Sequence, residues 1–444
     1  MITLQDYQQY LQFSLVEYRE FQLRYLKEFV KQVAQNSKHF KEQSIKVEIN
    51  SYEEFALLPL LEQEDLREKN IEEFRACPWE DICTVTRSSG TTGKSKIVLW
   101  SHEALTWEKK WGALGLLLSG LTRGSRYAIL MPLEMSRISS IIGVCKSIGA
   151  TAIPIGRITS EVDEYNAIEL IKRTGATHIL ATSTRLHSIG QKILDSDINT
   201  KTDIQVRHLI TGGIQSTDIQ RTHLEEMWHA DIFEQIGANE LSYIGFECEE
   251  HNGLHILPGS HYVEVVDQKT KKPILDNQTP GEVLITAFSN LATPLLRYRI
   301  GDLGYINYEK CACGLSFPRL FIKGRTMGTI SLGGTKIFSY QIENILNQFL
   351  PRTTLNYKVI VKKKGNIDLI SILIEASENF IKDKNLSKQI LNAFLNDSAS
   401  IYKILNKIKA GEVELKIKLV AKNSLERSSG DKIKKQFGDL RTGF

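Results

Sequence analysis

Apolar and aromatic side chains recur at helical spacing through the first 45 residues of the chain. The repeating positions are Leu11, Leu15, Tyr18, Phe21, Tyr25 and Phe29. Side chains spaced three or four residues apart share one face of a helix. Residues 1–45 are therefore predicted to form a long amphipathic helix or a helix pair, which serves packing and not chemistry.

Short apolar runs alternate with helical stretches from about residue 125 onward. The runs are YAILM at 127, ATAIPIG at 150, EYNAIELIKRT at 164, THILATST at 177 and VRHLITGG at 206. Strands that alternate with helices indicate a mainly parallel α/β sheet. From about residue 252 the segments HYVEVVD and GEVLITAF, separated by Gly, Pro and Asn, indicate antiparallel strands instead. We expect a small β-rich subdomain over residues 245–323.

The last third of the chain has a different pattern. A helical segment SYQIENILNQFL precedes the strand YKVIVKK, which Gly365 and Asn366 join to IDLISILIE. A helix is predicted over 379–397, and the alternation in VELKIKLV predicts a further strand. The predicted fold is therefore α/β, with a large N-terminal domain at 1–323 and a small, mobile α+β domain at 324–444.

Composition and charge exclude several classes of protein. The chain has 444 residues, 42% of them hydrophobic and 24% charged, which is typical of an ordinary folded protein. Its net charge of +4 is too weak to indicate nucleic acid or an anionic membrane as the main partner. The N-terminus lacks the apolar core of a signal peptide, and no apolar stretch is long enough to span a bilayer. We expect a cytoplasmic protein.

A run of hydroxyl, glycine and lysine residues is the sharpest chemical feature. The segment TRSSGTTGKSKIVLWSH contains Ser88, Ser89, Gly90, Thr91, Thr92, Gly93, Lys94 and Lys96. Such a loop can wrap a polyphosphate with amide, hydroxyl and ammonium donors. A Walker loop requires glycine five residues before Gly93, where this chain has Ser88. A surface loop without function remains the alternative.

Two closely spaced pairs of metal-binding residues flank the antiparallel segment. Cys248 and His251 are three residues apart, and Cys311 and Cys313 are two apart. Four such ligands could close a tetrahedral zinc site with no open position, which predicts a structural Zn²⁺. The alternative is that reduced cysteines pack here as small hydrophobic residues.

The glycine-rich run resembles the phosphate-binding signature of the adenylate-forming superfamily, and other segments match in the expected order. ITGGIQSTD, with Gly212 and Gly213, is similar to the adenine-side loop. QIGANELSYIG is similar to the segment that contacts adenine and holds Mg²⁺; it contains Ile236, Gly237, Ala238, Asn239 and Glu240. The resemblance implies that Glu240 binds Mg²⁺.

Three further positions take their roles from the same resemblance. Asp302, in NLATPLLRYRIGDLG, would bind the ribose hydroxyls, and Arg325, in IKGRT, would contact ribose and phosphate. LERSSGDKIKK resembles the segment with the superfamily's catalytic lysine, which corresponds to Lys432. The resemblance implies that Lys432, Glu240 and Lys96 act in the same reaction.

Within the superfamily, ECEEHNGLHI, CACG and IFSYQIE resemble the phenylacetate-coenzyme A ligase group. This resemblance implies an ATP-dependent ligase that forms an acyl-adenylate from an aryl or acyl carboxylic acid, releases pyrophosphate and transfers the acyl group to coenzyme A. Some members of the group have a similar zinc site. Transfer to an amine or to a carrier protein is the nearest alternative, a nucleotide-binding scaffold without catalysis is another, and a homodimer stays open.

Several positions depart from the superfamily pattern. Ile236 replaces the aromatic residue that stacks on adenine, and Asn239 replaces Thr or Ser. Met327 and Gly328 replace the usual acidic hinge pair, and Glu134 stands near the expected acyl pocket. These departures favour a specialised biosynthetic ligase. The pocket walls are predicted to include Ile141, Ile214, Ile236, Ala238 and Tyr243.

Overall fold

The computed structural model describes most of the chain. The described residues are 1–87, 94–131, 137–212, 218–325, 329–332, 335–350, 352–365, 367–396, 408, 410–422, 424–425 and 437–439. The chain divides into two compact units: the main part of the first ends at Ile322, and the main part of the second begins at Lys323. The sequence-based boundary, between 323 and 324, lies one residue further along.

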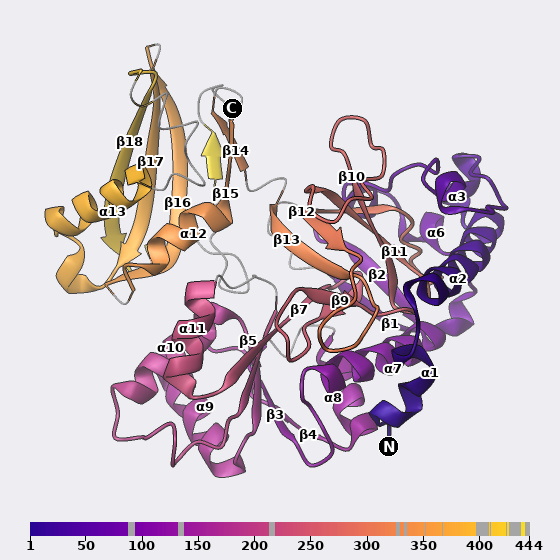
Figure 1. Cartoon of the computed structure of the whole chain (residues 1–444), viewed down its shortest axis with the longest axis horizontal. Coiled ribbons are helices and arrows are strands. Elements are labelled where there is room, and N and C mark those ends of the chain that lie inside the picture. The colour runs from indigo at the N-terminus through magenta and orange to yellow at the C-terminus, as the bar shows by residue number, and fades with distance from the viewer. Residues whose placement is uncertain are drawn as a thin grey trace. The chain divides into compact units, whose positions relative to one another are not determined.

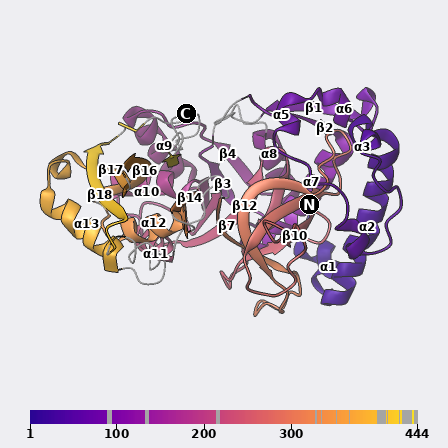
Figure 2. The same cartoon turned by 90° about the horizontal axis from the view of Figure 1, so that it is seen from above.

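The N-terminal segment contains several helices. A 3₁₀ turn, Leu4–Tyr7, leads into α1 (Gln8–Leu11), followed by α2 (Leu15–Asn36) and α3 (Lys38–Glu42). Ser14 starts α2 because its hydroxyl accepts from the Glu17 N–H while the Glu17 carboxylate accepts from the Ser14 N–H. Helix α3 lies between α2 and α6 (Ile71–Phe74) at one edge of the unit (Figure 2).

One sheet of eleven strands organises the first unit (Figure 1). Its parallel half has the order β4 (Thr151–Pro154), β3 (Arg126–Ile129), β5 (His178–Ala181), β6 (His208–Gly212) and β7 (Asp231–Ala238). The antiparallel half continues through β8 (Ser242–Phe246), β9 (Leu254–Ile256), β13 (Arg319–Arg325), β12 (Tyr298–Asn307), β11 (Gly281–Ala287) and β10 (His261–Val266). The predicted β-rich segment is thus continuous with the parallel sheet.

Helices cover both faces of the parallel half. On one face α7 (His102–Leu118) and α8 (Arg137–Ile148) share a hydrophobic core with Tyr127 and Ile129. On the other face α9 (Glu161–Thr174), α10 (Ser183–Leu194) and α11 (Asp218–Trp228) pack against Ala128 and Leu130. Successive side chains of β3 therefore enter opposite cores, as expected of a strand buried on both faces.

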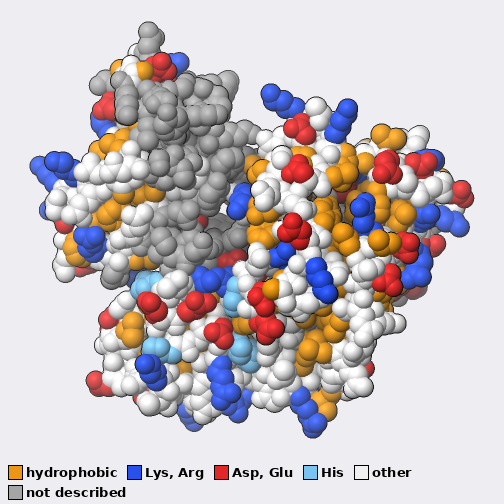
Figure 3. Space-filling view, viewed as in Figure 1, with side chains coloured by type: hydrophobic (Ala, Val, Ile, Leu, Met, Phe, Trp, Pro, Cys, Tyr) orange, Lys and Arg blue, Asp and Glu red, His pale blue; other side chains and the backbone are white. Residues whose placement is uncertain are grey.

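The remaining elements of the first unit are short. They are α4 (Tyr52–Phe55), α5 (Asp65–Glu68), the 3₁₀ turn Trp79–Asp81, and the antiparallel pair β1 (Ile82–Arg87) and β2 (Ile97–Ser101). Charged side chains of both signs are interspersed on the face of the molecule seen in Figure 3, as the small net charge leads one to expect. Among the described residues no helix is both long and apolar enough to cross a bilayer.

The second unit contains a four-stranded sheet with the order β18 (Val413–Ala421), β17 (Ile367–Ala376), β16 (Thr353–Lys364) and β19 (Phe437–Asp439). A separate pair, β14 (Thr329–Leu332) and β15 (Thr335–Phe338), precedes α12 (Ser339–Asn347). The helix predicted over 379–397 is the 3₁₀ turn Glu378–Phe380 followed by α13 (Lys384–Asn396). Asp383 caps the N-terminus of α13, because its carboxylate accepts hydrogen bonds from the N–H groups of Asn385 and Leu386. The helix therefore begins at Lys384. The predicted α/β class, with a C-terminal α+β part, is confirmed.

Candidate functional site

Glu240 lies in a tight turn at the carboxyl end of the last parallel strand. β7 pairs antiparallel with β8, Ala238 opposite Ser242, so that only residues 239–241 connect the two strands. The Leu241 N–H closes this turn on the Ala238 carbonyl at 3.1 Å. The carboxyl edge of a parallel sheet is where such folds commonly bind ligands. The local chain path thus holds the Glu240 carboxylate at this edge.

Lys96, Glu240 and Tyr298 form a buried polar cluster. The Lys96 ammonium is ion-paired with Oε1 of Glu240, and both side chains are less than a tenth exposed. Lys96 also donates to the Tyr298 hydroxyl at 2.9 Å, and that hydroxyl donates to the same Glu240 oxygen at 2.8 Å. The three side chains therefore come from three separate segments: the residue before β2, the β7–β8 turn and the start of β12.

The surroundings keep Glu240 ionised. Burial alone would raise the pKa of this carboxyl group, but the charge of Lys96 and the hydrogen bonds from Lys96 and Tyr298 lower it below its usual value. Gln63 borders the cluster, because Lys96 also donates to its amide oxygen at 3.4 Å. The site thus presents an ionised carboxylate beside an ammonium, a combination suited to a metal-bound anion.

Several other nucleotide-site candidates within the described residues lie on the same strands or next to them. Gly212 ends β6 opposite Gln235 of β7. Ile236 and Ala238 are half-buried and pack against the adjoining hydrophobic core, whereas Gly237 is exposed and Asn239 is half-buried. Asp302 is buried on β12, the strand that begins at Tyr298. The structure gives each of these positions a place near the carboxyl edge of β7 or on β12.

Some predicted residues cannot be placed. Ser88–Gly93, Gly213 and Lys432 lie outside the described residues, as do Glu134 and Ile214. Arg325 is the last residue of β13, and the structure describes its backbone only. Lys94 is exposed, and its ammonium forms an ion pair of 2.9 Å with Glu68.

A narrow cavity adjoins Glu240. Its walls include three tryptophans and several polar side chains, namely Trp100, Trp107, Trp111, Tyr243, Glu108, Ser242, His261 and Asn290. The buried Glu108 carboxylate accepts hydrogen bonds from Ser140, at 3.0 Å, and from Ser242. Of the predicted pocket walls, Tyr243 lines this cavity, whereas Ile141 is part of the core shared by α7 and α8.

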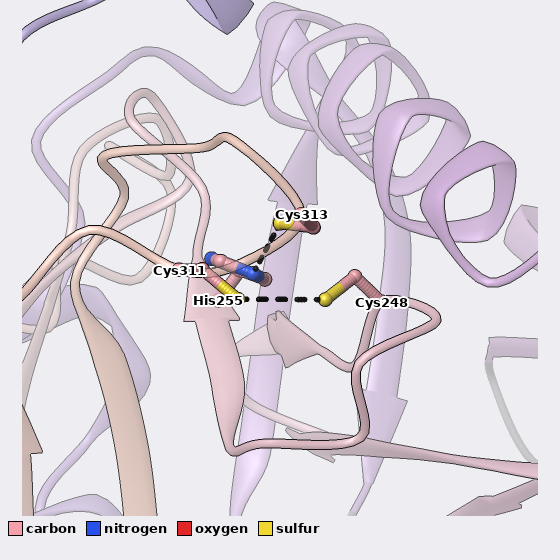
Figure 4. A group of neighbouring side chains, drawn as sticks. All are labelled: Cys248, His255, Cys311 and Cys313. Carbon is pink, nitrogen blue, oxygen red and sulfur yellow. Dashed lines mark hydrogen bonds between the residues drawn. The ribbon is translucent and has the colours of Figure 1, made fainter.

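A second cluster gathers three cysteines and one histidine (Figure 4). The ligand atoms of Cys248, His255, Cys311 and Cys313 lie within 4.8 Å of one another. The Cys248 and Cys311 sulfurs are 3.9 Å apart, and the Cys313 sulfur is 3.4 Å from Nε2 of His255. Tetrahedral zinc would separate two sulfurs by about 3.8 Å and a sulfur from a nitrogen by about 3.5 Å. The donor set and its spacing fit Zn²⁺.

His255, and not the predicted His251, is the fourth member of this cluster. The His251 ring contacts Oε2 of Glu247 at 3.4 Å and Nη1 of Arg221 at 3.2 Å. His251 also has a left-handed backbone at φ 47°, in the turn that its N–H closes on the Cys248 carbonyl. The His251 ring thus contacts Glu247 and Arg221, whereas His255, on β9, lies beside the three cysteines.

The second nitrogen of His255 is also fixed. Nδ1 lies 3.2 Å from the Phe317 carbonyl oxygen, so its N–H donates a hydrogen bond to that oxygen. The lone pair of Nε2 can then bind a metal ion. The turn at Cys311–Leu315 positions the other two ligands, since the Cys311 N–H donates to the Leu315 carbonyl at 3.0 Å. Four protein ligands leave no position for a substrate, which is typical of a structural site.

Sequence reasoning missed Tyr298, His255 and the tryptophan-lined cavity. Tyr298 lies in the segment already singled out for Asp302, but nothing in its spacing indicates a contact with Glu240. His255 lies in GLHI, within the segment already compared with the phenylacetate ligase group. The spacing of residues in the sequence does not show that His255 lies on a strand opposite the cysteine turn.

Comparisons with known proteins agree with this geometry. A model of the AMP-binding enzyme family matches residues 21–291, and one of the AMP-binding enzyme C-terminal domain matches residues 334–441. The chain belongs to the AMP-binding enzyme family. The predicted place in the adenylate-forming superfamily, near the phenylacetate-coenzyme A ligase group, is confirmed.

Individual relatives point in the same direction. The chain is 27% identical to a phenylacetate-coenzyme A ligase of Thermus thermophilus, over 88% of each protein, and 24% identical to one of Pseudomonas putida, over 74% of each. A 2-hydroxyisobutyryl-CoA ligase crystallised in a postadenylation state is similar over 96% of this chain and 90% of its own, with a TM-score of 0.80 and 18% identity. An anthranilate-CoA ligase matches 80% of this chain and 66% of its own, with a TM-score of 0.61 and 17% identity.

Proposed function

We propose that this protein is an ATP-dependent carboxylate ligase that forms an acyl-adenylate, releases pyrophosphate and then transfers the acyl group to coenzyme A. The observation that carries the proposal is the buried cluster of Lys96, Glu240 and Tyr298 at the carboxyl edge of the sheet. The relatives named phenylacetate-coenzyme A ligase support the same reaction class.

In this reaction the protein must position a carboxylate and offset charge that develops at the α-phosphate. Glu240 would hold Mg²⁺, which supplies positive charge to the phosphate oxygens when bound. Lys96 would share that role, and Asp302 would accept hydrogen bonds from the ribose hydroxyls. Ser88–Gly93, Lys94, Gly212, Gly213, Ile236–Asn239 and Arg325 would contact the nucleotide, and Lys432 would act in the adenylation step.

The cavity beside Glu240 is our proposed site for the acid. Its aromatic walls are of the type that lines small-molecule pockets. The cavity measures about 20 Å³ in this structure, so an aryl or acyl group would enter only where these side chains move apart. It adjoins the carboxylate proposed to hold the metal, so an acid bound there would lie next to the nucleotide.

Pyrophosphate exchange tests the reaction without assuming the acceptor. Purified protein with Mg²⁺, ATP and one acid from an aryl, heteroaryl and aliphatic panel should exchange labelled pyrophosphate into ATP. Added coenzyme A should then give the thioester and AMP. ADP as the sole nucleotide product would refute the proposal, and transfer only to amines or a carrier protein would replace coenzyme A as acceptor.

We also propose that Cys248, His255, Cys311 and Cys313 hold a structural Zn²⁺. The site would join the segment after β8 to the segment between β12 and β13. Metal binding to such a site stabilises the fold, because the unfolded chain does not hold the four ligands together.

A further inference from the structure

We propose that Tyr298 is a positioning residue that holds the Glu240 carboxylate and the Lys96 ammonium in the orientation needed by the metal–nucleotide complex. The inference rests on the proposed role of Glu240 in binding Mg²⁺. It assigns a function to a residue whose role sequence reasoning did not identify.

The Tyr298 hydroxyl contacts both charged members of the cluster. It accepts from Lys96 at 2.9 Å and donates to Glu240 at 2.8 Å, and the ring is completely buried. An ordinary tyrosine loses its proton only at about pH 10, so the phenol is protonated at neutral pH. Its single O–H therefore serves as a donor to the carboxylate.

The backbone on both sides of Tyr298 is anchored. The Leu61 N–H donates to the Arg297 carbonyl at 3.3 Å, and the Arg299 N–H donates to the Leu61 carbonyl at 3.0 Å. The preceding Arg297 has φ 46° and forms a buried ion pair with Glu264 at 3.1 Å. The left-handed backbone conformation of Arg297, held by this ion pair, fixes the direction of the chain immediately before Tyr298.

A hydroxyl that orients a metal-binding carboxylate acts from outside the coordination shell. Loss of such a partner typically weakens metal binding by about 10–100-fold, because the carboxylate then samples other orientations. Without the phenol, Glu240 would retain Lys96 as a counter-ion but lose one of the two donors that define the position of Oε1. The expected defect therefore appears in metal-dependent nucleotide binding.

Calorimetric titration of ATP into the full-length protein, with Mg²⁺ or with EDTA, tests this inference. Tyr298→Phe should weaken ATP binding about tenfold with Mg²⁺ and less than twofold with EDTA. In pyrophosphate exchange, the half-saturating Mg²⁺ concentration should rise by a similar factor. The variant keeps the buried ring, and its melting curve shows whether the fold is intact.

Tyr127→Phe is the matched control. Tyr127 is also completely buried, and its hydroxyl has no hydrogen-bond partner among the described residues. This control should bind ATP like the parent protein under both conditions. Glu240→Gln provides the reference for loss of the metal-binding carboxylate.

The outcomes separate the two proposals. If Glu240→Gln removes the effect of Mg²⁺ on ATP binding and Tyr298→Phe does not change it, the positioning role is wrong and the role of Glu240 stands. An equal loss of affinity with Mg²⁺ and with EDTA in Tyr298→Phe also overturns the positioning role. If Glu240→Gln behaves like the parent protein, both proposals fail together.

Discussion

Lys96 and Glu240 form a buried ion pair although 144 residues separate them in the chain. Lys96 lies just before β2 and Glu240 lies in the β7–β8 turn. The ion pair therefore links the end of the proposed phosphate loop to the proposed metal ligand. Removal of either partner would be costly, because an unpaired charge would remain buried.

Replacement of Lys96 by methionine should destabilise the first unit by about 3 kcal/mol, since the Glu240 carboxylate would lose its counter-ion while buried. Urea unfolding measures this change. Lys94→Met is the matched control: Lys94 pairs with Glu68 on the surface, so its loss should leave the unfolding midpoint unchanged. The double variant Lys96→Met/Glu240→Gln should recover part of the stability. A double variant as unstable as the sum of the two single variants would contradict this account.

Zinc content should depend on His255 and not on His251. We expect His255→Ala and Cys311→Ser to lose about one equivalent of zinc and to melt at a lower temperature, because the metal stabilises only the folded chain. His251→Ala should keep its zinc, since that ring contacts Arg221 and Glu247 instead. Elemental analysis of protein purified without added metal measures the content. Zinc-free parent protein, or loss of zinc in His251→Ala, would refute the assignment.

Stability should fall in mild acid because of His178. Burial and the stacked His208 ring lower the pKa of His178 to about 4, against about 6.5 for an unfolded histidine. Between these two values the unfolded chain takes up a proton that the folded protein does not, so unfolding becomes easier as the pH decreases. The full effect is about 3 kcal/mol and is absent above about pH 6.5.

Urea unfolding of the parent protein and of His178→Gln across pH 4 to 7 measures this contribution. The slope of stability against pH should be smaller in the variant. His102→Gln, at an exposed position in the first turn of α7, serves as the control and should keep the parent slope. An unchanged slope in His178→Gln would show that other groups carry the acid sensitivity.

Two glycines in neighbouring helices should respond oppositely to alanine. In α7, a Cβ on Gly115 would lie 2.1 Å from the Phe246 ring of β8, so Gly115→Ala should destabilise the protein by about 1–3 kcal/mol. In α8, a Cβ on Gly143 would meet no atom within 4 Å, so Gly143→Ala should stabilise the helix by about 0.5–1 kcal/mol. Thermal melting compares the two. A neutral Gly115→Ala would mean that α7 and β8 can separate without cost.

Much of the fold could be predicted because its signals are local. The alternation of short apolar runs with helical stretches predicts the parallel half of the sheet, and β3 has the side-chain alternation that two covered faces require. The stripe from Leu11 to Phe29 predicts helical structure, and the Ser14–Glu17 capping box explains why α2 begins at Leu15. The continuity of the antiparallel strands with the parallel sheet was missed, because strand pairing depends on contacts distant in sequence.

The candidate site divides in the same way. The residue types and order of the phosphate-loop and Glu240 segments are properties of the chain, and they suffice to indicate a nucleotide-binding ligase. The contact of Tyr298 with Lys96 and Glu240, and the choice of His255 over His251, depend on the β7–β8 turn, the start of β12 and the direction of β9. Only the folded chain decides these, since hydrogen bonds and metal geometry require separations of a few ångströms between atoms that sequence spacing does not determine.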